Sequence, residues 1–197
     1  LIYSGVSSVS YYGQIAGNLL GVHLGDGKGN FSDASVYRGG QTSFALAVAD
    51  FNRDGHPDVV TANQDSDSAT MFLNDGKGGF GAPQGEYVGY INGATSSGPV
   101  NAPYTSYSPA DVNGDGKQDL VVIEVGPGYP NPFQATVMLN DGTGKFGPAV
   151  HSPVAEGTAA LSDYILGDFR NTGKPDLVTV SYQGGPGPQM AFAANSG

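Results

Sequence analysis

The stretch that decides the fold is Asp50-Phe51-Asn52-Arg53-Asp54-Gly55-His56-Pro57-Asp58. It places oxygen-bearing side chains at positions 1, 3, 5 and 9, and a glycine at position 6, where the chain has to turn sharply. Hard oxygen ligands at this spacing are typical of a calcium-binding loop. The sequence therefore predicts a metal site in these nine residues.

The same nine-residue pattern occurs twice more, in residues 111–119 and 168–176. Self-similarity at a spacing of about 60 residues indicates a repeat protein built from one supersecondary unit. The second loop keeps every oxygen-bearing position. The third keeps Asp168, Gly173 and Asp176 but has Arg170 at position 3 and Thr172 at position 5.

Runs of β-forming residues flank each loop, so the loop is predicted to connect two strands of a hairpin. A third strand, a glycine-rich turn and a weaker fourth strand follow. Four antiparallel strands per repeat match the size of a propeller blade. The predicted strands are Ser43–Ala49, Val59–Ala62, Ala69–Leu73, Leu120–Ile123, Ala135–Leu139, Ala159–Leu166 and Leu177–Val180.

Both ends of the chain fall inside a repeat. Leu1–Ser4 aligns with the second strand of the later units, and Met190–Asn195 aligns with the third strand and the start of its turn. We therefore predict an all-β single segment of about three and a third blades, with units of roughly 1–40, 41–98, 99–157 and 158–197. A propeller ring usually has about four to eight blades. We expect a partial propeller, an aspartate loop upstream of Leu1, and self-association through the open blade edges.

Composition narrows the setting. The chain has 18 acidic and 8 basic residues, a formal charge of -10, and 32 glycines and 13 prolines among 197 residues. The negative charge argues against nucleic-acid binding, and no apolar run is long enough for membrane insertion. There is no cysteine, so no disulfide framework exists. If the protein is exported, its signal is expected upstream of Leu1.

These motifs resemble FG-GAP repeats, also called VCBS repeats, which build the β-propeller of integrin α chains and of many secreted bacterial proteins. The resemblance rests on the aspartate loop, its Ala49-Asp50-Phe51-Asn52 approach, and the turn that runs from Leu73 through Asn-Asp-Gly to Phe80-Gly-Ala-Pro83. It implies a secreted or cell-surface protein, bacterial in origin. It also implies a structural calcium ion between the first two strands of a blade, and ligands on the opposite face.

Carried over residue by residue, the resemblance implies two calcium sites and a doubtful third. His56 and Lys117 would contribute their main-chain carbonyls. The bland alternative is that Asp-Gly and Asn-Gly are only turn residues, which does not explain the repeated spacing. The expected ligands are Asp50, Asn52, Asp54, His56 and Asp58; Asp111, Asn113, Asp115, Lys117 and Asp119; and, more weakly, Asp168, Thr172 and Asp176.

In the third loop, a side chain is expected to replace the metal ion. A guanidinium at Arg170 can take over the role of the cation through charge-assisted hydrogen bonds. We therefore expect this blade to be metal-free or weakly bound.

An EF-hand or dockerin module is the competing interpretation of the loops. It requires an acid at position 12 and flanking helices, but position 12 is Thr61, Val122 or Thr179, inside β-branched runs. Catalysis is not expected either. His23, His56 and His151 share no motif, and there is no Gly-x-Ser-x-Gly elbow.

Recognition is predicted on the loops at the other end of the strands, where long connections carry aromatic side chains. These loops are Gly89–Ser108, Glu124–Gln134 and Ser181–Gln189. The expected partner is a glycan or an extracellular protein. The alternatives are a non-catalytic module of a secreted polysaccharide-degrading enzyme, a purely architectural repeat, and aromatics that only pack their own loops. The candidate contacts are Tyr90, Tyr104, Tyr107, Tyr129, Phe133 and Tyr182.

Overall fold

The computed structural model describes residues 2–6, 18–40, 43–63, 68–87, 106–125, 133–154, 160–183 and 187–195. These residues form β-strands, turns and loops, and they contain no helix, so none of them forms a helix that could cross a membrane. The strands assemble into four separate antiparallel sheets. The all-β, blade-like architecture predicted from the sequence is confirmed, and the sheets do not close into a ring.

Each sheet is a simple meander in which neighbouring strands follow one another in the chain. The first sheet has three strands, β1 (Ile2–Val6), β2 (Asn18–Val22) and β3 (Ser35–Arg38). The second has β4 (Ser43–Ala49), β5 (Asp58–Asn63), β6 (Ser68–Phe72) and β7 (Gln84–Tyr87). The third has β8 (Ser106–Ala110), β9 (Asp119–Val125), β10 (Phe133–Met138) and β11 (Val150–Pro153). The fourth has β12 (Ala160–Gly167), β13 (Asp176–Gln183) and β14 (Gly187–Ala193).

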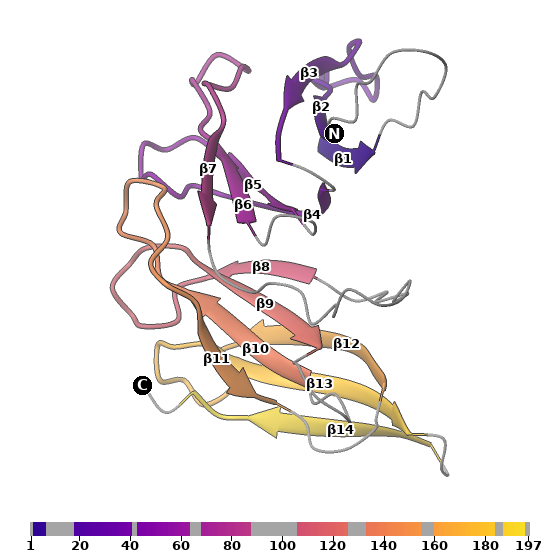
Figure 1. Cartoon of the computed structure of the whole chain (residues 1–197), viewed down its shortest axis with the longest axis vertical. Helices are drawn as coiled ribbons and strands as arrows, with labels where there is room; N and C mark the ends of the chain where they lie inside the picture. The colour runs from indigo at the N-terminus through magenta and orange to yellow at the C-terminus, as the bar shows by residue number, and fades with distance from the viewer. Residues whose placement is uncertain are drawn as a thin grey trace.

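The sheets lie one after another along the molecule, from β1–β3 at the top of Figure 1 to β12–β14 at the bottom. Apolar clusters fill the space between consecutive sheets. In β9, Leu120 and Val122 belong to the cluster shared with the second sheet, whereas Val121 and Ile123 belong to the cluster shared with the fourth. Side chains alternate between the faces of a strand. A strand buried on both faces therefore needs the unbroken apolar run seen here.

The repeat extends to fine detail. Register shifts occur at Ser43/Ala45 in β4 and at Leu161/Asp163 in β12, at the same distance before each aspartate loop. Both are the signature of a β-bulge, which bends a strand locally. The two first strands therefore share an irregularity that the strand pattern alone did not predict.

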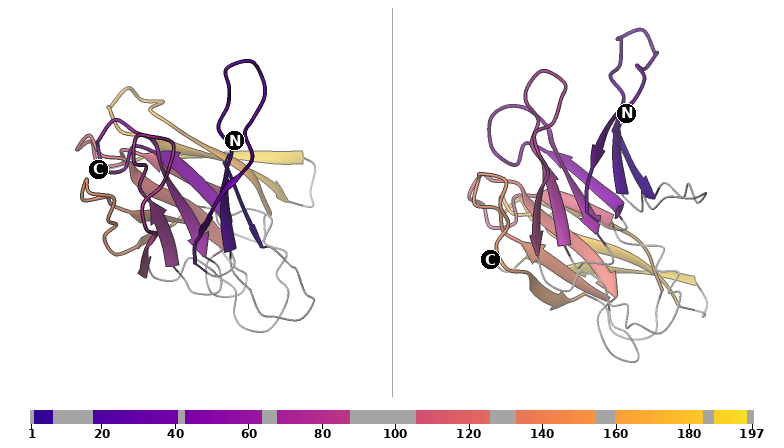
Figure 2. Two further views of the ribbon diagram at one scale, coloured as in Figure 1. Left: turned by 90° about the horizontal axis from the view of Figure 1, so that it is seen from above. Right: turned by 45° about the horizontal axis from the view of Figure 1, so that its top comes forward.

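Connections of two kinds leave the sheets at one end. In an antiparallel meander, the loop between strands one and two and the loop between strands three and four lie at the same end. The three aspartate loops accordingly lie along the left side of Figure 1, and Figure 2 shows the same grouping from two other directions. The fold thus collects the predicted metal loops on a single face.

Candidate metal centre

Each aspartate loop begins directly after the first strand of its sheet and ends on the first residue of the second strand. Asp58, Asp119 and Asp176 open β5, β9 and β13, and all three are fully buried. The backbone adopts positive φ at position 4 (Arg53, 64°) and at position 6 (Gly55, 88°). A left-handed backbone suits glycine, which explains the invariant glycine of the pattern.

The aspartate at position 1 organises the loop through main-chain hydrogen bonds. Asp50 Oδ1 accepts from the Asp54 amide at 3.1 Å, and its Oδ2 accepts from the Gly55 amide at 2.9 Å. In the next repeat, Asp111 accepts in the same way from Asp115 at 3.0 Å and Gly116 at 2.8 Å. The amide oxygen at position 3 also accepts from the position 5 amide in both loops. The loop is therefore shaped by its own acidic side chains.

The aspartate at position 9 joins the loop to the rest of its sheet. Asp58 accepts from the Phe51 amide at 3.0 Å and from the Asn74 amide at 2.9 Å. Asp119 likewise accepts from the Val112 amide at 3.1 Å and from the Asn140 amide at 2.8 Å. Each carboxylate thus ties the loop to the end of the third strand.

Burial disfavours the ionised form of the two position 9 carboxylates, Asp58 and Asp119. Burial raises the pKa of Asp58, and the nearby negative charge of Asp54 raises it further. The pKa of Asp119 is raised in the same way, by burial and by Asp115 and Asp111. A positive charge in the loop would reverse this effect, because an opposite charge favours the ionised carboxylate.

The donor chemistry of the first two loops fits a hard divalent cation. Each offers three carboxylates, an amide oxygen and a main-chain carbonyl, and calcium takes oxygen ligands of these kinds. Asp58 Oδ2 and Asp111 Oδ1 each accept two amide hydrogen bonds, whereas Asp50 accepts one at each oxygen and so keeps free lone pairs. Among the described residues, however, no three acidic or histidine side chains lie close enough together to hold one metal ion. Coordination would therefore require the loop carboxylates to converge further.

The third loop carries its own cation. Arg170 Nε donates to Asp176 Oδ1 at 3.0 Å, and the guanidinium lies 2.7 Å from the same oxygen. Arg170 also donates to the Asn195 carbonyl. Its hydrogen bond and charge lower the pKa of Asp176, the opposite of the direction at Asp58 and Asp119. The predicted charge-assisted hydrogen bond between Arg170 and a carboxylate of its own loop is present, with Asp176 as the partner.

The same loop has a looser backbone. The Phe169 amide bonds to the Gly167 carbonyl at 3.0 Å instead of to Asp176, and Asp176 Oδ2 has no hydrogen-bond partner among the described residues. Phe169 is 55% exposed, whereas Phe51 at the same position is fully buried. The loop therefore lacks one of the two ties that the first two loops make.

An asparagine after the third strand links neighbouring sheets, a role that was not predicted from the sequence. Asn140 Nδ2 donates to the Phe51 carbonyl of the preceding sheet at 2.7 Å, and Asn195 Nδ2 donates to the Val112 carbonyl at 2.8 Å. The signal was the recurrence of Asn74, Asn140 and Asn195 at one repeat position, which reads as turn chemistry alone. Asn140 and Asn195 therefore fix their own sheets to the aspartate loop of the preceding sheet, whereas Asn74 bonds to the Pro57 carbonyl of its own sheet.

The predicted aromatic face is only partly described. Tyr90, Tyr104 and Tyr129 lie outside the described residues. The predicted loop boundaries are wrong for the other three, because the strands extend further than the sequence indicated. Tyr107 lies in β8, Phe133 in β10 and Tyr182 in β13. Tyr107 is only 7% exposed and belongs to the core between the second and third sheets, so it is not a surface contact.

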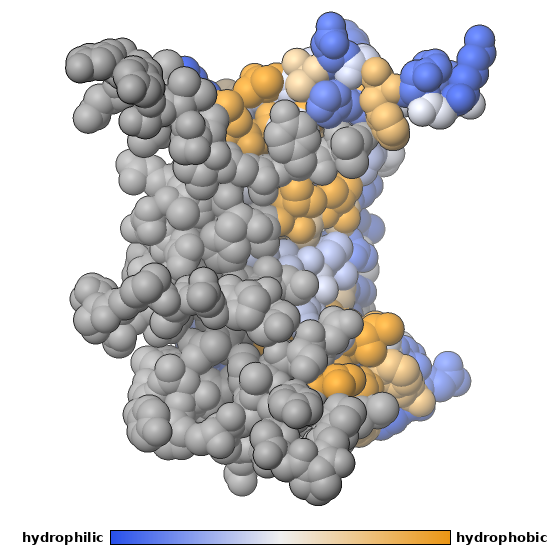
Figure 3. Space-filling view, turned by 90° about the vertical axis from the view of Figure 1, so that its right-hand side faces the viewer, coloured by the Kyte–Doolittle hydropathy of each residue, from blue (hydrophilic) through white to orange (hydrophobic). Residues whose placement is uncertain are grey.

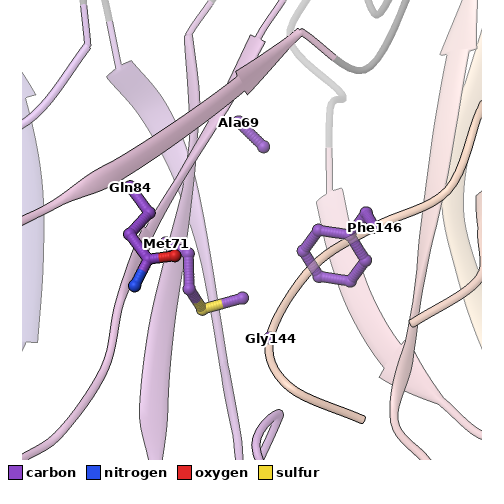
Figure 4. Close-up of a pocket in the computed structure, with 5 residues that line it drawn as sticks. All are labelled: Ala69, Met71, Gln84, Gly144 and Phe146. Atoms are coloured by element: carbon purple, nitrogen blue, oxygen red, sulfur yellow. The ribbon is translucent and has the colours of Figure 1, made fainter. Parts of the chain in front are cut away.

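A surface hollow and the histidines are two further candidate sites. A shallow hollow lies where Gly144 and Phe146 meet Met71 and Gln84 (Figure 4), but it has no room for a water-sized molecule, whereas ligand pockets usually enclose about 300 Å³ or more. The histidines occupy different sheets. His23 contacts the Ser32 carbonyl at 2.7 Å, and His151 contacts the Thr136 hydroxyl at 2.7 Å. Neither feature assembles a catalytic group.

Comparison with known proteins agrees with this architecture. Among solved structures, a Photorhabdus luminescens Tc holotoxin pore matches with a TM-score of 0.54 and 16% sequence identity, over 92% of this chain. The chain spans only 8% of that protein's length, and at this identity the likeness shows the fold alone. No curated protein sequence matches the chain. The family model described as FG-GAP-like repeat matches residues 8–61, 50–122 and 111–179, each match ending just after an aspartate loop. The chain therefore belongs to the FG-GAP-like repeat family.

Proposed function

We propose that this chain is a calcium-stabilised extracellular binding module whose metal loops hold the scaffold together at one end. The observation that carries the proposal is the contrast between loops. Two loops bury an aspartate whose pKa is raised and offer oxygen donors around it, whereas the third neutralises the equivalent aspartate with Arg170. A structural cation in the first two loops would do for the buried position 9 aspartate what Arg170 does in the third. In the second loop Lys117 pairs at 2.8 Å with Asp115 at position 5, not with the buried Asp119.

Calcium would be held by Asp50, Asn52, Asp54, Asp58 and the His56 carbonyl, and by the corresponding set from Asp111 to Asp119. The ion supplies positive charge and ligand bonds that neutralise the buried carboxylates. Because the position 9 aspartates also contact the third-strand asparagines, metal binding in one loop would stabilise the adjoining sheet interface as well.

Recognition is proposed for the opposite end of the sheets, with a glycan or an extracellular protein as partner. The metal-loop end is committed to the scaffold, since its asparagines and aspartates bond across and within sheets. Loops on a rigid scaffold are the usual place for binding residues. The proposed contacts are Tyr90, Tyr104 and Tyr129, whose positions in the sequence lie between the described strands.

A thermal melt with calcium and with chelator tests the metal. Saturation at 100 times the dissociation constant stabilises by about 2.7 kcal/mol per site, which corresponds to roughly 5–10 °C for a chain of this size. The double variant Asp54→Asn, Asp115→Asn should lose most of this shift. Asp141→Asn, an exposed turn aspartate outside the loops, should keep it. No shift in the wild type would overturn the calcium proposal.

A binding screen tests whether the end of the sheets opposite the aspartate loops recognises a partner. We expect the calcium-loaded chain to bind a subset of a glycan array or an extracellular-matrix protein, and Tyr104→Ala, Tyr129→Ala to reduce that signal. Lys77→Ala, an exposed change at the metal-loop end, serves as the control. Release of reducing ends from a polysaccharide would instead favour the alternative of a degrading enzyme. If the tyrosine variant binds as well as the Lys77→Ala control, these tyrosines are not the contacts.

A further inference from the structure

A lysine side chain already occupies part of the second aspartate loop. Lys117 Nζ donates to Asp115 Oδ2 at 2.8 Å, and the Lys117 amide donates to Asp115 Oδ1 at 3.0 Å. Asn113 Nδ2 also donates to Oδ2, at 3.1 Å. That oxygen therefore accepts two hydrogen bonds, which use both of its lone pairs. Asp115 holds position 5, one of the expected calcium ligands.

The first loop leaves the equivalent carboxylate open. Asp54 Oδ1 accepts from the His56 amide at 2.9 Å, and its Oδ2 accepts from Asn52 Nδ2 at 2.8 Å, so each oxygen keeps one lone pair. Within the part of the chain that the structure describes, no lysine or arginine forms an ion pair with Asp54. The Lys117 hydrogen bond is the largest cause that lowers the pKa of Asp115, whereas the Asn52 hydrogen bond is the largest at Asp54.

Packing holds Lys117 in this place. A Cβ atom added to Gly142, in the turn after β10, would lie 3.0 Å from Lys117 Cδ and 3.3 Å from its Cε, so the aliphatic stem lies directly over this glycine. In the preceding repeat the ring of His56 lies over Gly76 in the same way, with Nε2 2.5 Å from such a Cβ. The position 7 side chain therefore has the same location in both sheets, but it ends in an ammonium group only in the second.

The first two loops have the same formal charge. Each contains three aspartates and one arginine or lysine, which is Arg53 in the first loop and Lys117 in the second. Arg53 is exposed and, among the described residues, forms no ion pair with a carboxylate of its loop. An exposed charge that touches no ligand is screened by salt. The difference between the loops therefore lies in the pairing.

Basic side chains that pair with acids gather at the loop end of the sheets. The two ion pairs of the described residues, Lys117–Asp115 and Arg170–Asp176, both lie in aspartate loops. Figure 3 shows the side of the molecule away from these loops, where hydrophobic side chains reach the surface at several levels of the stack. The loops thus form a series, with no such pair in the first, a partly exposed pair at position 5 in the second, and a pair to the buried position 9 in the third.

We propose that Lys117 competes with calcium for Asp115, so that the second loop binds the ion more weakly than the first and fills at a higher calcium concentration. The inference rests on the proposed function, calcium binding by both loops. Ligation by Asp115 Oδ2 requires Lys117 Nζ to leave that oxygen, and an ammonium group that stays nearby repels a divalent cation. A partly exposed ion pair of this kind corresponds to about a two- to fivefold change in affinity.

Calorimetric titration of the full chain with calcium chloride tests the proposal in variants that keep one loop intact. Asp54→Asn removes a ligand of the first loop, and Lys117→Gln added to it should raise the calcium affinity of the second loop about two- to fivefold. The gain should shrink as the sodium chloride concentration rises, because salt screens exposed charges. Asp115→Asn removes a ligand of the second loop. In that background His56→Lys introduces the competing ammonium group and should lower the affinity of the first loop by a similar factor.

Arg53→Gln in the Asp115→Asn background is the matched control. It removes an equal but unpaired charge, so it should change the calcium affinity by less than Lys117→Gln does. A second loop that binds as tightly as the first, or an affinity that Lys117→Gln leaves unchanged, would overturn this inference and leave calcium binding intact. A wild type that takes up no calcium would overturn the proposed function, and this inference with it.

Discussion

The contribution of the hydrogen bond between sheets to stability can be measured by comparing Asn140, which makes it, with Asn74, the equivalent residue of the preceding repeat, which does not. Asn140 is buried and makes three side-chain hydrogen bonds, to the Phe51 carbonyl, the Gln118 carbonyl and the Gly142 amide. At about 1 kcal/mol each, their loss in Asn140→Ala should destabilise the protein by about 3 kcal/mol. For a chain of this length, this corresponds to a fall in melting temperature of roughly 6–12 °C.

The control is the same substitution one repeat earlier. Asn74 bonds to the Pro57 carbonyl at 2.9 Å and accepts from the Gly76 amide at 2.9 Å, with both contacts exposed and within its own sheet. Asn74→Ala should therefore cost about 1 kcal/mol. Urea denaturation followed by circular dichroism, with calcium in excess, measures both. If the two variants have equal unfolding free energies, the bond between sheets contributes nothing and the reasoning fails.

Two further substitutions test the loops. Arg170→Gln leaves the buried Asp176 without its charge partner and should lower the melting temperature by several degrees, whereas the exposed Arg38→Gln should not. Because Arg170 lowers the pKa of Asp176, the ion pair stabilises the fold above the ordinary aspartate pKa of about 3.9. That stabilisation is lost as pH falls through the lowered value, so the gap between Arg170→Gln and wild type should narrow in acid; a gap independent of pH would contradict this. Arg53→Gly should raise the unfolding free energy by about 0.5 kcal/mol, since Arg53 has a φ of 64° and its equivalent is already Gly114. Arg53→Ala keeps the strain and should show no such gain in the same urea titration.

The repeat and its strands could be predicted because the aspartate loop and the apolar run after it occur together in every repeat. The run from Asp119 to Ile123 combines a loop acid with uninterrupted apolar residues, and the structure uses both faces of that strand. The ion pair between Arg170 and Asp176 was also predictable, since a cation at a ligand position has few other roles.

The remaining site features depend on contacts between distant residues. Tyr107 looked like a loop aromatic because Gly, Ser and Pro surround it, but its side chain fills the core between two sheets. The role of Asn140 depends on a carbonyl 89 residues away. Similarly, Phe51 and Phe169 both occupy position 2 of an aspartate loop, but Phe51 is buried because it packs against the third sheet, whereas Phe169 is exposed.

The two hydrogen bonds accepted by the position 9 aspartate limit how the length of the repeat can change in evolution. Its two oxygens bridge the start of the loop and the end of the third strand, so an inserted or deleted residue between them would break one contact. All three loops have the same length. The links from Asn63 to Ser68, from Val125 to Phe133 and from Gln183 to Gly187 have three different lengths. Relatives should therefore accumulate insertions and deletions at that end of the sheets, which is also where foreign sequence could be grafted.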